Sequence, residues 1–394
     1  MTVSNSGLFS QLLGVFPRAE FARLVALHGA ERGAKGFSCF TQFVAMLFCH
    51  IARADSLREI CHGLQSFGGK LRHLGLARAP ARSTLSYANA HRPPELYEDL
   101  FFLLLARLRG QSGLLPQRHR FSFSNPLLSL DSTVVSLSLS LFPWADYNRT
   151  KGGIKVHIVL DHCDYLPRFV HIGDARQHDI QYARSLSLPP GSIVAMDRGY
   201  MDLRLLFRWT GEGVFFVTPQ KLYMKLHCVQ ENQVAPGGQV RSDRLVQPCS
   251  RDARRKYRQP LRQIELEIEE RDGSRRSLTL LTNHLSLAAE EIAAIYKERW
   301  QIELFFKALK QNLTLRSFVG TNENALKTQI WTALIALLLL KWLHYRSGQR
   351  WSLSNLAATL RLNLFTYRDL TDFLNKPWDP PPAPPPSSQL QMCF

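Results

Sequence analysis

The stretch "LLSLDSTVVSLSLSLF", residues 127–142, marks a change in the pattern of the chain. Apolar and polar residues alternate along it, which is the period of a β-strand with one buried face. Residues 1–115, before it, carry apolar residues at helical spacing, as in "FTQFVAMLFCHIA" and "ELYEDLFFLLLARL". The stretch therefore predicts the first strand of a sheet that follows a helical N-terminal domain.

Further strands and helices follow this strand. Strand patterns at 152–161 and 166–173 come next, and then helical and strand patterns alternate up to residue 220. This order predicts a mixed α/β core. We expect five segments: a helical N-terminal domain (1–115), the first part of the core (116–220), a separate β-rich insertion (221–283), the C-terminal helices of the core (284–375) and a proline-rich tail (376–394).

The charge of the chain points to a polyanionic partner. Its 394 residues carry a formal net charge of +17, while 45% hydrophobic residues give ordinary material for a core. A strongly basic foldable chain usually binds nucleic acid, although a membrane surface or a ribosome would also fit the charge. We expect the basic run 251–258 to face DNA.

Cysteine usage and hydropathy favour a cytoplasmic, nucleoid-associated protein without a membrane partner. The seven cysteines contain no C-x-x-C pair, which disfavours structural zinc and a disulfide framework. No signal-peptide pattern is visible at the N-terminus. The apolar window 330–344 is shorter than the ~20 residues that span a bilayer, so we expect a buried helix there.

The segment "YKERWQIELFFKALK", residues 296–310, places one acid among cations. At 100° per residue, a helix puts Tyr296, Arg299, Glu303, Lys307 and Lys310 on one face about 80° wide. A solvated edge with an Arg299–Glu303 ion pair at i,i+4 would explain this face without any function. The alternative is that Glu303 belongs to a site with acids from elsewhere.

Two upstream acids favour the second interpretation. Asp131 lies inside the alternating strand, and Asp197 follows the apolar strand "SIVAM". A carboxylate at such a place is costly unless something compensates its charge. Magnesium or manganese is the natural compensation, and two such ions held by acids can cut a phosphodiester. Taken singly, Asp131 or Asp197 could equally be a turn or cap residue.

The three acids and their surroundings resemble the DDE transposases of bacterial insertion sequences, and most closely the insertion sequence 4 family. The motifs are "LDST", "MDRGY" and a helix with Tyr296, Arg299, Glu303 and Lys310 at the family spacing. The resemblance covers about residues 5–345, including the small N-terminal domain. It implies a ribonuclease-H-like core that uses magnesium or manganese, and cut-and-paste movement through a hairpin at the element's ends.

The resemblance also implies roles for residues. Asp131, Asp197 and Glu303 would be the catalytic and metal-binding triad, and nearby cations and aromatic residues would contact DNA. These DNA-binding candidates are Arg198, Tyr200, Tyr296, Arg299, Lys307 and Lys310. The expected partners are double-stranded DNA at transposon ends, target DNA and a second copy of the chain in the DNA complex.

Two departures and three rival interpretations accompany the resemblance. Leu278 stands where some members carry a base-flipping tryptophan, and Pro219 stands where a basic residue is expected. A ribonuclease-H-like nuclease without transposition and a transposase-derived DNA-binding protein without cleavage are the nearest rivals. A ribosome- or membrane-associated protein would explain the charge but not the three acids.

Overall fold

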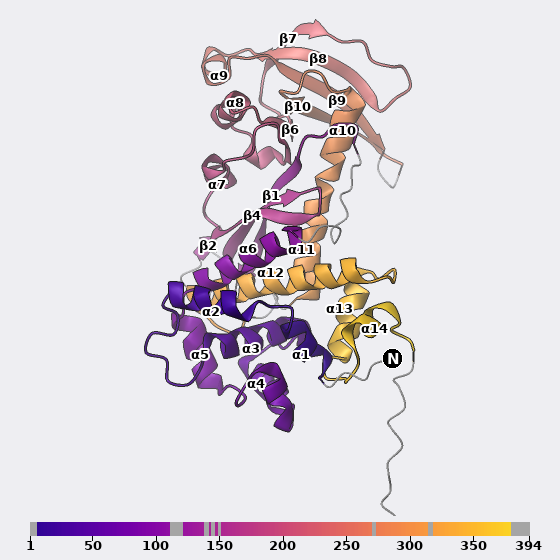
Figure 1. Ribbon diagram of the computed structural model, residues 1–394. Coiled ribbons are helices and arrows are strands. Elements are labelled where there is room, and N and C mark those ends of the chain that lie inside the picture. The colour runs from indigo at the N-terminus through magenta and orange to yellow at the C-terminus, as the bar shows by residue number, and fades with distance from the viewer. Residues whose placement is uncertain are drawn as a thin grey trace, which may run out of the picture. The chain divides into compact units, whose positions relative to one another are not determined.

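The computed structural model describes residues 6–110, 121–137, 142, 146–148, 151–269, 273–313 and 318–379. The chain divides into two compact units, one of Met1–Leu115 with Ala308–Phe394 and one of Pro116–Lys307. Figure 1 shows the helices of the first unit and the sheet of the second. We describe each unit by itself.

The first unit is helical, as its sequence pattern predicts. Its N-terminal helices are α1 (Leu8–Leu13), α2 (Arg18–Leu27), α3 (Cys39–Ala52), α4 (Leu57–Gln65), η1 (Gly68–Leu74), α5 (Arg82–His91) and α6 (Glu95–Gly110). Its C-terminal helices are α12 (Glu323–Arg346), α13 (Leu353–Leu362) and α14 (Leu370–Asn375). Side-chain caps fix several starts: Ser38, Ser56 and Asn322 accept backbone N–H groups at the N-termini of α3, α4 and α12.

Helix α12 is the core of this unit, and it corrects one expectation. It is apolar around its whole circumference and packs against α3, α5 and α6. Although long and apolar enough to cross a membrane, it has 89% of its apolar window buried inside the protein, as expected for 330–344. We expected residues 284–375 to belong with the sheet. From Ala308 onward they join the N-terminal helices instead, because α12 needs apolar neighbours on every side.

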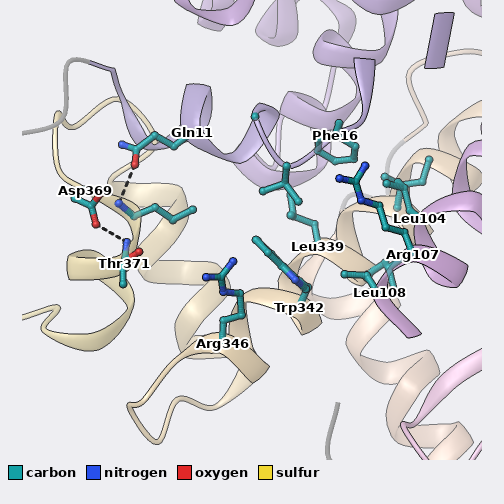
Figure 2. Close-up of a pocket in the computed structure, with 15 residues that line it drawn as sticks. Gln11, Phe16, Leu104, Arg107, Leu108, Leu339, Trp342, Arg346, Asp369 and Thr371 are labelled. Atoms are coloured by element: carbon teal, nitrogen blue, oxygen red, sulfur yellow. Dashed lines mark hydrogen bonds between the residues drawn. The ribbon is translucent and has the colours of Figure 1, made fainter. Parts of the chain in front are cut away.

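A cavity of about 530 Å³ lies within the helical unit (Figure 2). Apolar side chains from α6 and α12, such as Leu104 and Leu339, form much of its wall. Its one carboxylate, Asp369, caps α14 by accepting the Thr371 N–H at 2.8 Å. This cavity therefore has no cluster of acids and is not where the expected chemistry lies.

The second unit contains a ten-stranded sheet. Its strands are β1 (Leu127–Leu137), β2 (Asp146–Asn148), β3 (Lys151–Asp161), β4 (Leu166–Asp174), β5 (Ile193–Met196), β6 (Phe215–Pro219), β7 (Leu226–Glu231), β8 (Val240–Pro248), β9 (Leu261–Glu269) and β10 (Arg275–Thr282). The order is β2-β3-β1-β5-β6-β10-β9-β8-β7, with β4 also paired to β3. Strands β1, β3 and β4 are antiparallel neighbours, while β5 and β6 run parallel to β1. The predicted mixed α/β class is confirmed.

The expected separation of residues 221–283 from the central sheet is wrong. The segment is rich in strands, but β10 pairs with β6 in antiparallel register, Leu281 opposite Thr218. Strands β9, β8 and β7 then extend the same sheet. The physical reason is that β6 would otherwise leave a row of unpaired backbone groups at an edge.

Helices cover both faces of this sheet, as Figure 1 shows. They are α7 (Asp179–Ser185), η3 (Arg198–Tyr200), α8 (Leu203–Gly211), α9 (Arg251–Lys256) and α10 (Ala289–Glu298). Helix α11 (Trp300–Asn312) follows α10, with only Arg299 between them in helical geometry. One apolar cluster joins the sheet to α8 and the other joins it to α10.

Candidate active site

The strand register brings two of the expected acids together. Strands β1 and β5 are parallel neighbours, with Leu130 opposite Met196. Asp131 directly follows Leu130, and Asp197 directly follows Met196. Because adjacent strands lie about 4.8 Å apart, the backbones of the two acids are neighbours. Two carboxylates 66 positions apart in the sequence thus meet at one place in the sheet.

Arg299 connects the third acid to this pair. Its Nη1 donates to Oδ2 of Asp131 at 3.1 Å, and its Nη2 donates to Oε1 of Glu303 at 2.7 Å. The Arg299 side chain is 15% exposed, so this contact is largely shielded from water. The i,i+4 ion pair of a solvated edge is therefore present, but the same guanidinium also holds an acid of the sheet.

The surroundings of Asp131 raise its pKa to about 6. Burial is the largest cause, and the negative charges of Asp197 and Glu303 act in the same direction. The Ser132 backbone N–H, which donates to Oδ1 of Asp131 at 2.7 Å, and the Arg299 charge oppose the rise but do not cancel it. Negative charge is thus under-compensated where the three acids converge.

The donor set suits a hard divalent cation, although a guanidinium stands between two of the donors. Carboxylate oxygens are the ligands that Mg²⁺ and Mn²⁺ prefer. In the described part of the chain, no group of three or more His, Cys, Asp or Glu side chains is arranged to hold an ion. Arg299 supplies the positive charge between Asp131 and Glu303 instead. The chemistry of the site therefore fits a metal, provided that Arg299 gives up at least one acid.

The other candidates lie along the same helices and near Asp197. Tyr296 is half-buried, and the Arg299 guanidinium lies 5.5 Å from its ring centre. Lys307 is exposed, and burial lowers the pKa of Lys310 in the last turn of α11. Arg198 is exposed in η3, directly after Asp197. Contact of these four side chains with DNA stays a prediction.

Tyr200 is the exception, and its expected contact with DNA is corrected. Its side chain is 2% exposed and belongs to the apolar cluster under α8. Its hydroxyl lies 3.3 Å from Nδ1 of His157. Tyr200 is buried because the residues after Asp197 must turn back onto the sheet before α8 begins. It supports the segment that carries Asp197 rather than meeting a ligand.

A neighbouring acid, Asp179, was missed by the sequence analysis. It accepts from Ser132 Oγ at 2.9 Å, and Lys155 Nζ and His157 Nδ1 lie 3.2 and 3.8 Å from the same Asp179 oxygen. The available signal was the pattern "KVH" in β3, which puts Lys155 and His157 on one buried face of a strand. Such residues need a partner, but the pattern does not say which acid supplies it.

Four further acids near these strands bind backbone groups within three residues of themselves. Backbone N–H groups donate to Asp161, Asp164, Asp174 and Asp202 at 3.0, 2.8, 2.9 and 2.9 Å. The described cysteines are free thiols. Leu278, at the position of the expected base-flipping residue, is partly buried against the α10 side of the sheet.

Comparison with known proteins places this geometry in a family. Residues 122–339 match the model of the transposase DDE domain, and residues 4–77 match a domain of unknown function, DUF4372. The inferred transposase y4zB of Sinorhizobium fredii is 35% identical over 70% of this chain and 75% of its own length. The inferred transposase of insertion sequence element IS5377 of Geobacillus stearothermophilus is 28% identical over 69% and 70%.

A third relative, the inferred transposase of element IS4SA of Synechocystis, is 28% identical over 66% of this chain and 71% of its own length. The order of β4, β3, β1, β5 and β6 is that of a ribonuclease-H-like core, as the matched domain implies. The chain therefore belongs to the DDE transposases, within the insertion sequence 4 family, and is an enzyme of DNA cleavage and strand transfer.

Proposed function

We propose that the chain moves an insertion sequence by a cut-and-paste route through a hairpin at the element's ends, using divalent metal ions. Asp131, Asp197 and Glu303 hold Mg²⁺ or Mn²⁺, as two ions. The observation that supports this most directly is the meeting of Asp131 and Glu303 at one guanidinium, with Asp197 on the neighbouring strand.

The chemistry divides between the metal and the side chains. When bound, two ions supply activation of the attacking oxygen and stabilisation of the leaving oxygen. The chain itself orients the DNA. Arg299 can exchange a carboxylate for a phosphate oxygen, because guanidinium groups bind both in the same forked geometry. Exposed Arg198 and Lys307 are placed to hold the backbone of the same strand.

The partners follow from this reaction. The helical segment 1–115 binds the transposon ends, the acids act on their terminal phosphodiesters, and the free ends are joined to target DNA. Two copies of the chain hold the two ends in one complex. The proposed segment boundaries are those expected from the sequence, except that residues 221–283 extend the central sheet and the chain from Ala308 joins the helical unit.

Glu303→Gln separates the chemistry from binding. The substitution keeps the size of the side chain and removes the charge that holds a cation. Cutting of duplex DNA that carries the element's end should be lost in the presence of magnesium, whereas a gel shift on the same DNA should be unchanged or slightly stronger.

Glu290→Gln is the matched control, since Glu290 is an exposed acid on α10 away from the site. It should cut at the wild-type rate. If Glu303→Gln also cuts at that rate, Glu303 is not the third acid. Wild-type protein that binds the ends but never cuts them would favour a DNA-binding protein derived from a transposase.

A further inference from the structure

The sheet of the second unit has two faces, and the acids lie toward only one of them. Neighbouring residues of β1 and β5 alternate between the faces. Leu127, Ile193 and Ala195 pack with α10, the helix that precedes Arg299 and Glu303. Leu128, Val194 and Met196 pack with Leu205, Leu206 and Trp209 of α8. Helix α8 therefore covers the face opposite α10 (Figure 1).

Cations gather on the outer surface of this opposite face, where α8 and α9 are neighbours. We name this surface the opposite-face ridge; its members are Arg204, Arg208, Arg251, Arg254, Arg255, Lys256 and Arg258. Asp252 and Glu212 are the acids on the same segments. Each already has a cation, Lys256 at 2.5 Å from Asp252 and Arg208 at 3.4 Å from Glu212.

Four ridge arginines are exposed and have no acid of the described residues in direct contact, although the charges of Arg204 and Arg255 also act on the Asp252 carboxylate. In the described part of the chain, they form no ion pair and no side-chain hydrogen bond with another residue; they are Arg204, Arg251, Arg255 and Arg258. Buried Arg262 in the same unit is the contrast, since it binds both carboxylate oxygens of Asp243 at 2.8 and 2.7 Å. The fold thus pairs Arg262, Arg208 and Arg254 with groups of the protein and leaves the four other ridge arginines open to a partner.

We infer that the opposite-face ridge binds the phosphate backbone of the target duplex while the element's end occupies the acids on the other side. This inference rests on the proposed function. Arginine contacts to phosphate give affinity without reading sequence. A target can have many sequences, whereas an end must be recognised by its bases, so a surface of this kind suits the target.

The surface also favours duplex DNA over other polyanions. Single-stranded nucleic acid is usually held by a series of exposed aromatic rings, and a membrane surface by exposed apolar side chains beside the cations. On α8 and α9, Phe207 is the large apolar side chain that is exposed, and only to 37%. Tyr223 is 94% exposed two residues before Lys225, whose carbonyl accepts the Cys249 N–H next to α9, but it is a single ring and not a series.

The test uses the full-length protein, magnesium, precut end DNA with a free 3′-hydroxyl, and a plasmid of arbitrary sequence as target. Arg251→Gln/Arg255→Gln should reduce joining at low plasmid concentration about tenfold, because two phosphate contacts are lost. For the same reason, the slope of the logarithm of the plasmid binding constant against the logarithm of salt concentration should become shallower by about 1.8. More plasmid should restore joining. Cutting of uncut end DNA should stay within about twofold of wild type.

A control variant and a second ridge variant accompany this measurement. Arg350→Gln/Lys376→Gln removes the same charge from exposed positions outside the ridge and outside segment 1–115, and it should behave as wild type. Arg204→Gln, on α8, should lower joining about threefold, since one contact is lost. Wild-type joining by the α9 double variant, or an equal loss of cutting and joining, would overturn the inference. Wild-type protein that neither cuts nor joins would instead refute the proposed function, and the ridge inference with it.

Discussion

Two carboxylates on opposite faces of β1 show how differently this fold treats an acid. Asp179 accepts a hydrogen bond from Ser132 Oγ at 2.9 Å and forms an ion pair with Lys155 at 3.2 Å. Asp131 accepts hydrogen bonds from the Ser132 N–H and from Arg299, but burial, together with the smaller effect of two further acids, raises its pKa to about 6. A carboxylate whose charge is compensated supports the structure. One whose charge is left under-compensated marks a place for a cation that the folded chain does not itself supply.

Replacing each acid by its amide gives the sharpest test of this difference. Asp131→Asn should reduce end cutting by on the order of 10³-fold, since the proposed metal ligand is lost, while relief of repulsion leaves the unfolding free energy unchanged or slightly higher. Asp179→Asn should cost about 1–3 kcal/mol of stability by leaving Lys155 short of its partner, and should lower cutting no more than about tenfold. Urea unfolding and a nicking assay measure both. Equal destabilisation by the two variants would remove the distinction.

The pH dependence of the unfolding free energy tests the environment of Asp179. Burial lowers the pKa of His157, beside Asp179, to about 4, so the folded protein keeps this imidazole neutral. In the unfolded chain this imidazole keeps its ordinary pKa of about 6.5, so as pH falls it binds a proton before the folded protein does. The stability that depends on the neutral imidazole is therefore full above pH 6.5 and is lost as pH falls toward 4. By pH 5 the loss should reach about 2 kcal/mol, or roughly 30-fold in the unfolding constant. His157→Gln should show a shallower decline in urea melts; an identical decline would exclude His157 as the cause.

Metal affinity tests the environment of Asp131 without relying on enzymatic activity. Arg299 competes with a cation for Asp131 and Glu303 in the DNA-free protein. Arg299→Gln should therefore raise Mn²⁺ affinity about tenfold, because the competing charge is gone. The loss of the electron paramagnetic resonance signal of free Mn²⁺ measures this affinity. End DNA should raise the Mn²⁺ affinity of wild type but have a smaller effect on the variant. An unchanged or weaker affinity for Arg299→Gln without DNA would show that the guanidinium does not compete.

The sequence predicted the parts of this molecule that depend on local periodicity. The alternation around Asp131 and the apolar strand before Asp197 gave the class of fold, and the helical wheel put Arg299 and Glu303 on one face. Cap and turn acids such as Asp202 were predictable for the same reason, since their partners lie within a few residues.

The errors concern long-range partners. Nothing in the strand pattern of 275–282 states that β10 pairs with β6 rather than with a separate sheet. The aromatic motif around Tyr200 does not reveal that its ring points into the core. Asp179 gains its meaning only from Lys155 and Ser132, which lie 24 and 47 positions away in the sequence.

The smallest predicted effect concerns Lys310, seven residues after Glu303 on the same helix. Burial lowers its pKa, so a bound phosphate would favour its charged form. Lys310→Ala should weaken binding to end DNA about fivefold and reduce the log–log salt slope by about 0.9, the value for one phosphate contact. Lys297→Ala is the control, because this exposed lysine lies about 100° away from the face of Tyr296 and Glu303. Mn²⁺ affinity should be unchanged in both. A loss of metal affinity in Lys310→Ala would place this lysine with the acids, whereas an equal loss of DNA affinity in both variants would mean that only the overall charge of the helix matters.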